Sequence, residues 1–260
     1  MIKPTLVQIW KTRNDLETSV ASKIIDVMHR SLKKNTRCCI VLSGGETPKI
    51  VYRHMGQNKP NGSVDWSRVH VFFCDERAVP PDHPNSNYGM IEREWISHIS
   101  IPPENVHRIK GEIDPTIASE KYEQEIRNVF GSAPVVFDFV LLGVGEDGHT
   151  ASLFPGSDAV LEKKALVRSA FTQRFNNWRV TLTVPALNAS HEIVFLAAGK
   201  KKASIVRRIL DAKVPDTKLP ASLIRPIEGS FCWMIDEEAA LQLKEDSSII
   251  IERVATSVNK

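Results

Sequence analysis

Short apolar runs of strand length recur along this chain, and stretches with helical periodicity separate them. The runs are "RCCIVL" (residues 37–42), "VHVFFC" (69–74), "FDFVLL" (137–142) and "EIVFLAA" (192–198). A strand that is apolar on both faces is buried on both faces, which is typical of a parallel sheet covered by helices. The alternation therefore predicts an α/β fold with a mainly parallel sheet and helices on both of its faces.

Weaker patterns complete the expected order of elements. Further strands are expected at 5–10, 178–184 and 231–235, and helices at 15–34, from Pro48 onward, at 87–96, 116–129 and 201–210, and after a cap at Asp236. The chain shows no internal repeat, and the Pro-, Asp- and Asn-rich segment 79–88 has the length of a site loop. We therefore expect one α/β domain over residues 1–260.

Composition excludes several classes of partner. The 260 residues include 34 basic and 31 acidic side chains, a net charge of +3, which does not favour nucleic acid or a membrane surface. No apolar run approaches the ~20 residues that cross a bilayer, and the N-terminus has no pattern of a secretory signal. We expect a monomer whose partner is a small molecule.

The four cysteines, Cys38, Cys39, Cys74 and Cys232, lie in apolar runs and show no C-x-x-C spacing. This pattern indicates buried free thiols rather than disulfides or metal ligands. Free thiols are typical of a reducing compartment, so the sequence predicts a cytoplasmic protein.

Four of the expected strands end in polar sequences that could carry chemistry. These ends are residues 43–45, 75–77, 143–149 and 199–200. Because the carboxyl ends of parallel strands meet at one edge of a sheet, ligands bind there. The convergence of these four segments is the strongest indication of a functional site.

The segment 143–148 spells G-x-G-x-x-G, which is a weak signal for a dinucleotide cofactor. That function requires a long helix after the glycines, and Pro155 follows too soon for one. A phosphate-binding P-loop would have lysine where His149 stands, and Glu146 and Asp147 would repel a triphosphate. We therefore expect no nucleotide cofactor.

A third interpretation fits the turn better. Its glycines present Asp147 and His149 at the sheet edge, where a carboxylate and an imidazole can orient and activate a water molecule. The alternative is that His149 only packs within the turn. The neighbouring polar strand ends favour the catalytic role.

The segment "LSGGETP" (42–48) is a glycine turn that leads into a helix. Free N–H groups at a helix N-terminus bind anions, and Ser43, Gly44, Gly45 and Thr47 would supply backbone or hydroxyl donors. A plain turn is the alternative. Glu46 is unfavourable here, so it must point away from a bound anion, or the site does not take phosphate.

Several cations could complete an anion site. Asp75 and Arg77 follow one strand, and arginine suits a two-pronged grip on phosphate or carboxylate, although an internal Asp–Arg pair is the alternative. Arg179 opens one strand and Lys200 follows another, whereas residues 201–202 are expected in solvent. The sequence contains no G-x-S-x-G elbow, no H-E-x-x-H and no paired C-x-x-C metal motif.

The ordered set "LSGGETP", "DERAVP" with "SN", "GVGEDGHTASLFPG", "RVTLTVPALN", "GKKKA" and "LPASLIRP" spans nearly the whole chain. In this combination the chain resembles the 6-phosphogluconolactonase family. The resemblance implies a Rossmann-like fold shared with glucosamine-6-phosphate deaminases. It also implies hydrolysis of 6-phosphoglucono-δ-lactone without cofactor or metal.

The resemblance also implies roles for individual residues. His149 would be the general base with Asp147 beside it, and Asp75 would lie in the pocket in a less defined role. The phosphate would be held by Ser43, Gly44, Gly45, Arg77, Arg179 and Lys200. Glu46 departs from the small residue that the family pattern favours, which leaves the detail of the loop open.

Two alternatives remain at this stage. The first is a sugar-phosphate deaminase or isomerase of the same fold, whose turn typically continues "IAFNEP" and which carries Tyr after "DE". This chain continues "TASLFP" and carries Arg77. The second is a catalytically silent sugar-phosphate sensor, which the loss of His149 or Asp147 would have favoured.

Overall fold

The computed structural model describes residues 4–57, 64–212, 214–226, 228–244 and 249–254. Their α-helices are α1 (Arg13–Leu32), α2 (Glu46–Gln57), α3 (Asn87–Glu94), α4 (Pro115–Phe130), α5 (Asp158–Leu161), α6 (Val184–Asn188) and α7 (Ala203–Leu210). Their strands are β1 (Thr5–Trp10), β2 (Cys38–Leu42), β3 (Val69–Phe73), β4 (Asp75–Arg77), β5 (Val106–His107), β6 (Phe139–Gly143), β7 (Val167–Thr172), β8 (Asn177–Leu182), β9 (Glu192–Ala197), β10 (Ser230–Asp236) and β11 (Ile249–Val254).

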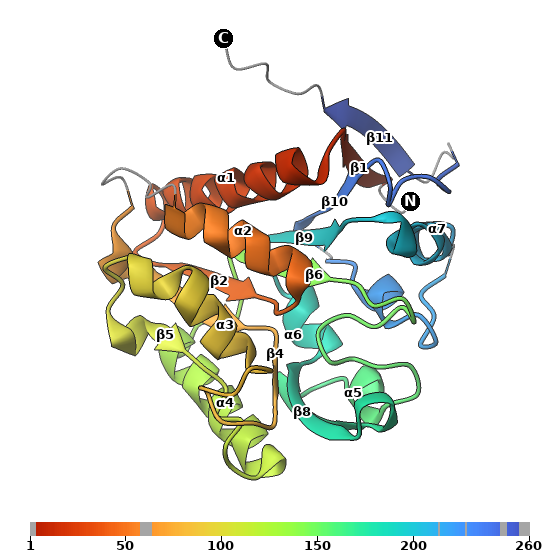
Figure 1. Cartoon of the computed structure of the whole chain (residues 1–260). Helices are drawn as coiled ribbons and strands as arrows, with labels where there is room; N and C mark the ends of the chain where they lie inside the picture. The colour runs from red at the N-terminus through yellow and green to blue at the C-terminus, as the bar shows by residue number, and fades with distance from the viewer. Residues whose placement is uncertain (1–3, 58–63, 213, 227, 245–248, 255–260) are drawn as a thin grey trace.

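Eight strands form one parallel sheet in the order β11-β1-β10-β9-β6-β2-β3-β5. Every residue of β2 is buried, as expected for a strand covered on both faces. The parallel α/β fold expected from the apolar runs is therefore confirmed, and Figure 1 shows the sheet running through the molecule.

Helices α1, α2 and α3 pack side by side, and α1 and α2 also contact the sheet (Figure 1). The chain runs from β1 to β2 to β3 in one direction and from β5 through β6 and β9 to β10 in the other. Because crossovers between parallel strands are right-handed, the helices of these two runs cover opposite faces of the sheet. No helix among the described residues combines the length and apolarity needed to cross a membrane.

Capping explains where the longer helices begin. The side chain of Thr12 accepts the backbone N–H of Asp15 and starts α1. Asp114 accepts the N–H groups of Thr116 and Ile117 and starts α4, in which Pro115 takes the first position. These caps are local sequence signals, which is why both helices lie close to their expected ranges.

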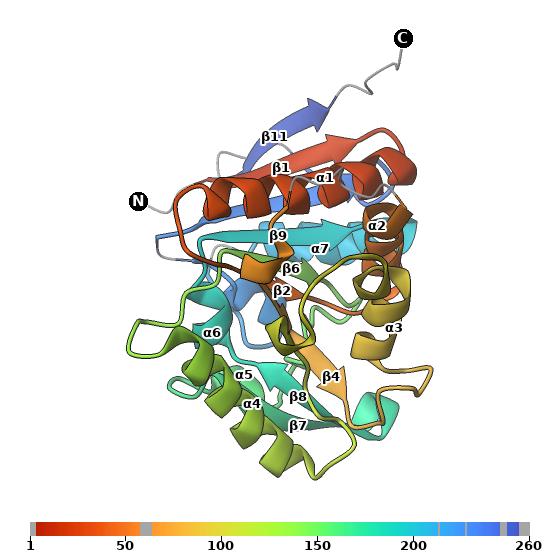
Figure 2. The same cartoon turned by 90° about the vertical axis from the view of Figure 1, so that its left-hand side faces the viewer.

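A second, antiparallel sheet of three strands corrects one expectation. The strand expected at 178–184 is β8, and it lies between β4 and β7 outside the parallel sheet. The two sheets meet at Cys74, whose N–H donates to Leu42 of β2 and whose carbonyl accepts from Leu182 of β8. Figure 2 shows this small sheet beside α4, at the end of the molecule opposite β11.

The end of the chain corrects a second expectation, because no helix follows β10 in 236–244 or 249–254. The carboxylate of Asp236 accepts N–H groups of Gly199 and Ala239 at 2.8 to 3.0 Å, so it stabilises a turn and not a helix. The sequence analysis also missed β11, which pairs with β1 along its whole length. Its β-branched residues 249–251 were the available signal.

All four cysteines are free and buried, as the sequence analysis expected. Burial raises the pKa of the Cys39 thiol to about 12 and that of Cys232 to about 11. Because the thiolate is the reactive form, these side chains act as small apolar core residues.

A histidine pair at the edge of the sheet should make the stability depend on pH. His70 Nδ1 lies 3.0 Å from His107 Nε2, and His107 Nδ1 lies 2.9 Å from a carboxylate oxygen of Glu125. Burial, followed by the charges of His107 and Arg37, lowers the pKa of His70 to about 4. Between about pH 6.5 and 4 the unfolded chain therefore binds the proton more readily, and the stabilisation by neutral His70 is lost as the pH falls.

We expect His70→Gln to reduce the loss of stability between pH 7 and pH 5. Urea unfolding at pH 7 and pH 5 should show a smaller drop in the free energy of unfolding for the variant than for the unmodified protein. His191→Gln, at an exposed histidine, is the matched control and should retain the full drop. Equal drops in all three proteins would show that His70 does not contribute.

Candidate active site

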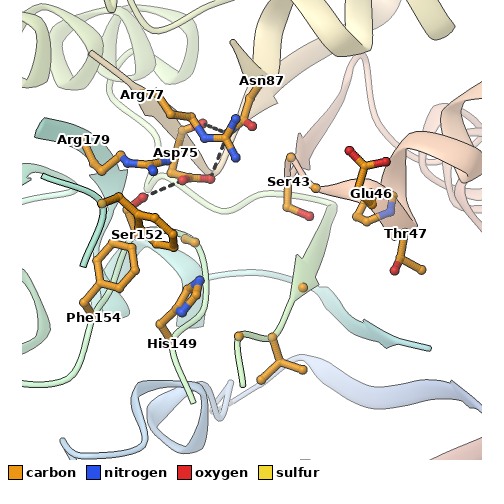
Figure 3. Close-up of a pocket in the computed structure, with 18 of the residues that line it drawn as sticks. Ser43, Glu46, Thr47, Asp75, Arg77, Asn87, His149, Ser152, Phe154 and Arg179 are labelled. Carbon is orange, nitrogen blue, oxygen red and sulfur yellow. Dashed lines mark hydrogen bonds between the residues drawn. The ribbon is translucent and has the colours of Figure 1, made fainter. Parts of the chain in front are cut away.

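A cavity of about 500 Å³ lies beyond the carboxyl ends of β2, β6 and β9 and is closed on one side by β4 and β8. From β2 the chain adds β3 and β5 on one side, and from β6 it adds β9 and β10 on the other. The order of strands therefore reverses between β2 and β6, which is where open α/β sheets bind ligands. Three groups of side chains reach the cavity from different sides in Figure 3.

The first group is the glycine turn between β2 and α2. Gly45 has φ +113°, which favours glycine, and α2 begins at the next residue. The hydroxyl of Ser43 is buried and lacks a hydrogen-bond partner, and Thr47 also lines the cavity. The first N–H groups of a helix have no partner within the helix, so this turn presents several donors to an anion.

Glu46 does not oppose that role. Its side chain is 89% exposed and its carboxylate lies 4.0 Å from the ammonium group of Lys49. Water and a neighbouring cation screen its charge, so the carboxylate adds little repulsion to an anion in the cavity.

The second group surrounds Asp75, which is buried on β4. One carboxylate oxygen accepts from Ser152 Oγ at 2.6 Å, and the other lies 3.3 Å from Asn87 Nδ2. Arg77 and Arg179 stand opposite each other in the β4–β8 register, and each has a buried Nε without a partner. Figure 3 shows both guanidinium groups beside Asp75.

Arg179 lies among charges of both signs. Burial lowers its pKa from the usual value, the carboxylates of Asp75 and Glu76 oppose that shift, and Arg77 adds to it. Within the described part of the chain, no nitrogen of Arg77 or Arg179 forms an ion pair within 4 Å of a carboxylate oxygen of Asp75. Both arginines line the cavity, and the Nε of each has no hydrogen-bond partner within the protein, so the pair suits the binding of an anion.

The third group is the turn that carries His149. The backbone N–H of Gly145 donates to the carbonyl of His149, and that of Gly148, at φ +88°, donates to the carbonyl of Gly145. A side chain at Gly145 would stand 2.1 Å from His149 Nδ1, so only glycine allows the imidazole to lie over the turn. Gly145 and Gly148 of the G-x-G-x-x-G string therefore serve the placement of His149.

The imidazole is oriented for proton transfer. Its Nδ1 lies 2.5 Å from a carboxylate oxygen of Asp147, which accepts the Nδ1 proton and leaves the lone pair on Nε2. The ring packs against Phe154, with 4.6 Å between centroids. Asp147 does not itself line the cavity, and its carboxylate contacts His149, which does.

A lysine of the "GKKKA" segment reaches the cavity, but it is not Lys200. Lys202 lines the cavity, and its ammonium group donates to the carbonyl of Val144 at 2.8 Å. Lys200 is exposed. The segment is a 3-10 turn, Lys200–Lys202, that follows Gly199 at φ +88°. With three residues per turn, the phase of this turn and not its composition decides which lysine faces the cavity.

Sequence analysis missed other residues of the cavity, notably Asn87, Ser152, Phe154 and Phe175. Asn87 is buried at the start of α3, where the carboxylate of Glu76 accepts its backbone N–H at 2.7 Å. A Cβ at Gly44 would stand 1.7 Å from Asn87 Oδ1, so the asparagine packs directly against the glycine turn. The "SN" and "TASLFPG" motifs were the signals that could have identified these residues.

No group of three or more His, Cys, Asp or Glu side chains in the described part of the chain could hold a metal ion. The helix that follows the glycine string, α5, has only four residues, which does not provide the long helix of a dinucleotide site. The groups that the cavity does present are an imidazole, guanidinium and ammonium groups, and backbone donors.

A family model described as glucosamine-6-phosphate isomerases/6-phosphogluconolactonase matches residues 11–233. The chain belongs to this family. A 6-phosphogluconolactonase of Nostoc is 34% identical over 235 residues, which cover 87% of this chain and 95% of the relative. The rat 6-phosphogluconolactonase is 35% identical over 241 residues, which cover 91% and 93%.

Solved structures of this family agree over most of the chain. The 6-phosphogluconolactonase of Thermotoga maritima has a TM-score of 0.76 at 34% identity and covers 90% of this chain and 100% of its own. That of Trypanosoma brucei has a TM-score of 0.81 at 28% identity, with 94% and 100% covered. A monomeric glucosamine-6-phosphate deaminase, at 22% identity and a TM-score of 0.77, shares the fold.

Proposed function

We propose that the chain is a 6-phosphogluconolactonase, which hydrolyses 6-phosphoglucono-δ-lactone to 6-phosphogluconate. The observation that carries this proposal is the pairing of His149 Nδ1 with Asp147, in a cavity that also holds the unpaired guanidinium nitrogens of Arg77 and Arg179. The names of the most similar relatives agree with it.

The reaction needs little beyond these groups. His149 Nε2 takes a proton from water as the water oxygen attacks the lactone carbonyl, and cationic and backbone donors stabilise the oxyanion. The ring C–O bond then breaks, and the imidazolium returns the proton to the departing ring oxygen. A lactone is a reactive ester, so no covalent nucleophile is required.

Phosphate binding supplies the positioning. We assign the phosphate-binding role to the turn at 43–47, to Arg77 and Arg179, and to Lys202 in place of Lys200. Binding energy from a group remote from the reaction fixes the lactone ring next to the base. The oxygens of Asp75 already accept hydrogen bonds from Ser152 and Asn87, so we assign this carboxylate to offsetting part of the arginines' charge and not to the role of base.

Acid release in a pH-stat tests the proposal, with spontaneous ring opening subtracted. We expect rapid hydrolysis of the phosphorylated lactone and slow hydrolysis of unphosphorylated gluconolactone. Ammonia release from glucosamine 6-phosphate would support the deaminase alternative. Binding of 6-phosphogluconate without any lactone turnover would support the sensor.

We also propose one domain over residues 1–260, a monomeric state and a cytoplasmic location. The two sheets share hydrogen bonds through Cys74 and enclose one cavity, which supports a single domain. The four free thiols support a reducing compartment. Light scattering after gel filtration would measure the oligomeric state.

A further inference from the structure

Ser152 joins the two halves of the cavity. It lies three residues after His149 and is 1% exposed, and its hydroxyl donates to Asp75 on β4 at 2.6 Å. Its backbone N–H donates to the hydroxyl of Thr181 on β8 at 3.1 Å. Ser152 therefore connects the histidine turn to the sheet that carries both arginines, and Figure 3 shows its hydrogen bond to Asp75.

The backbone next to Ser152 is strained. Ala151 has φ 47°, a left-handed conformation that a residue with a Cβ seldom adopts. Such a conformation persists only where the surroundings fix it, and it is concentrated at functional sites. Here the hydroxyl of Thr150 donates to the carbonyl of Gly143 at 2.8 Å on one side, and Ser152 is fixed on the other.

Asp75, which accepts the hydrogen bond from Ser152, is also held in place by Asn87. Asn87 Nδ2 donates to the main-chain carbonyl of Asp75 at 2.9 Å and lies 3.3 Å from its carboxylate. Asp75 is thus fixed from α3 and from the histidine turn at once. Among the charged groups around Arg179, Asp75 has the largest effect on the pKa of its guanidinium. The position of Asp75 therefore affects the electrostatic environment of the two arginines.

We propose that Ser152 is a positioning residue whose hydroxyl sets the distance between His149 and the Asp75–arginine group. This inference rests on the proposed function, since it assigns the arginines to the phosphate and His149 to the water. With the hydroxyl in place, a substrate held by its phosphate presents its carbonyl to the base. Without the hydroxyl, a substrate held by its phosphate no longer places its carbonyl carbon next to the water that His149 activates.

The test compares two lactones in one variant. Ser152→Ala should lower kcat/KM for the phosphorylated lactone roughly ten- to a hundredfold, the range for a hydrogen bond to a charged group. The loss on unphosphorylated gluconolactone should be at least about tenfold smaller, because that substrate does not use the arginines. Equal losses on both lactones, or no loss on either, would overturn the proposal.

Two further variants separate positioning from folding. Ser157→Ala, in the same loop but outside the cavity, is the matched control and should keep the unmodified ratio of the two activities. In a protein that already carries Asp75→Asn, adding Ser152→Ala should lower kcat/KM for the phosphorylated lactone by a further factor of less than about three, because the effects of coupled residues are not additive. Additive losses would show that Ser152 acts independently of Asp75. If the unmodified protein hydrolyses neither lactone, the proposed function fails instead.

Discussion

His149→Ala should lower kcat for the phosphorylated lactone by roughly 10²- to 10⁴-fold, the contribution of a positioned general base. The dissociation constant of 6-phosphogluconate should stay within about threefold, because the phosphate-binding groups are untouched. Steady-state kinetics and calorimetric titration of the product measure the two quantities.

Asp147→Asn sharpens this test. An amide cannot act as the carboxylate that orients the Nδ1 proton, so the variant should lose kcat and keep product binding. His191→Ala, at an exposed histidine outside the cavity, is the matched control and should retain full activity. A near-normal kcat in His149→Ala would remove the base assignment. Joint loss of product binding and thermal stability would show that His149 only packs the turn.

The sequence identified the parallel sheet and the main parts of this site because both depend on local patterns. A run such as 37–42 can only be buried on both faces, and the strand ends at 43–45, 75–77 and 143–149 then have to meet at one edge. The glycine turn before α2 follows from its composition in the same way. These inferences need no knowledge of which strands are neighbours.

The rest depends on contacts between distant segments. A strand pattern at 178–184 does not reveal that its partner is β4, because periodicity carries no information on pairing. The choice of Lys202 over Lys200 depends on the phase of a turn that starts at Gly199. Ser152 is one small polar residue among many until the fold brings it to Asp75, 77 positions away in the sequence.

Arg179→Ala should raise KM for the phosphorylated lactone about tenfold or more, since a hydrogen bond to a charged group contributes ~1.5–3 kcal/mol. Arg179 is 9% exposed and lines the cavity, and its Nε has no partner within the protein, so its guanidinium has donor capacity left for a bound phosphate. Unphosphorylated gluconolactone, a poor substrate throughout, should be hydrolysed at an almost unchanged rate. The measurement is kcat and KM for both lactones.

The structure also predicts what this change does to the unbound protein. Arg77, which is half-buried, lowers the pKa of the buried Arg179 by like-charge repulsion, so removing one arginine should leave Tm unchanged or slightly higher. Arg179→Lys keeps the charge but loses the planar fork, and should recover only part of the lost affinity.

Lys202→Ala should also raise KM for the phosphorylated lactone, whereas Lys200→Ala, its matched control on the exposed side of the turn, should not. If Arg179→Ala reduces the hydrolysis of both lactones equally and lowers Tm, the arginine supports the fold, and the phosphate must be held by the helix turn, Arg77 and Lys202.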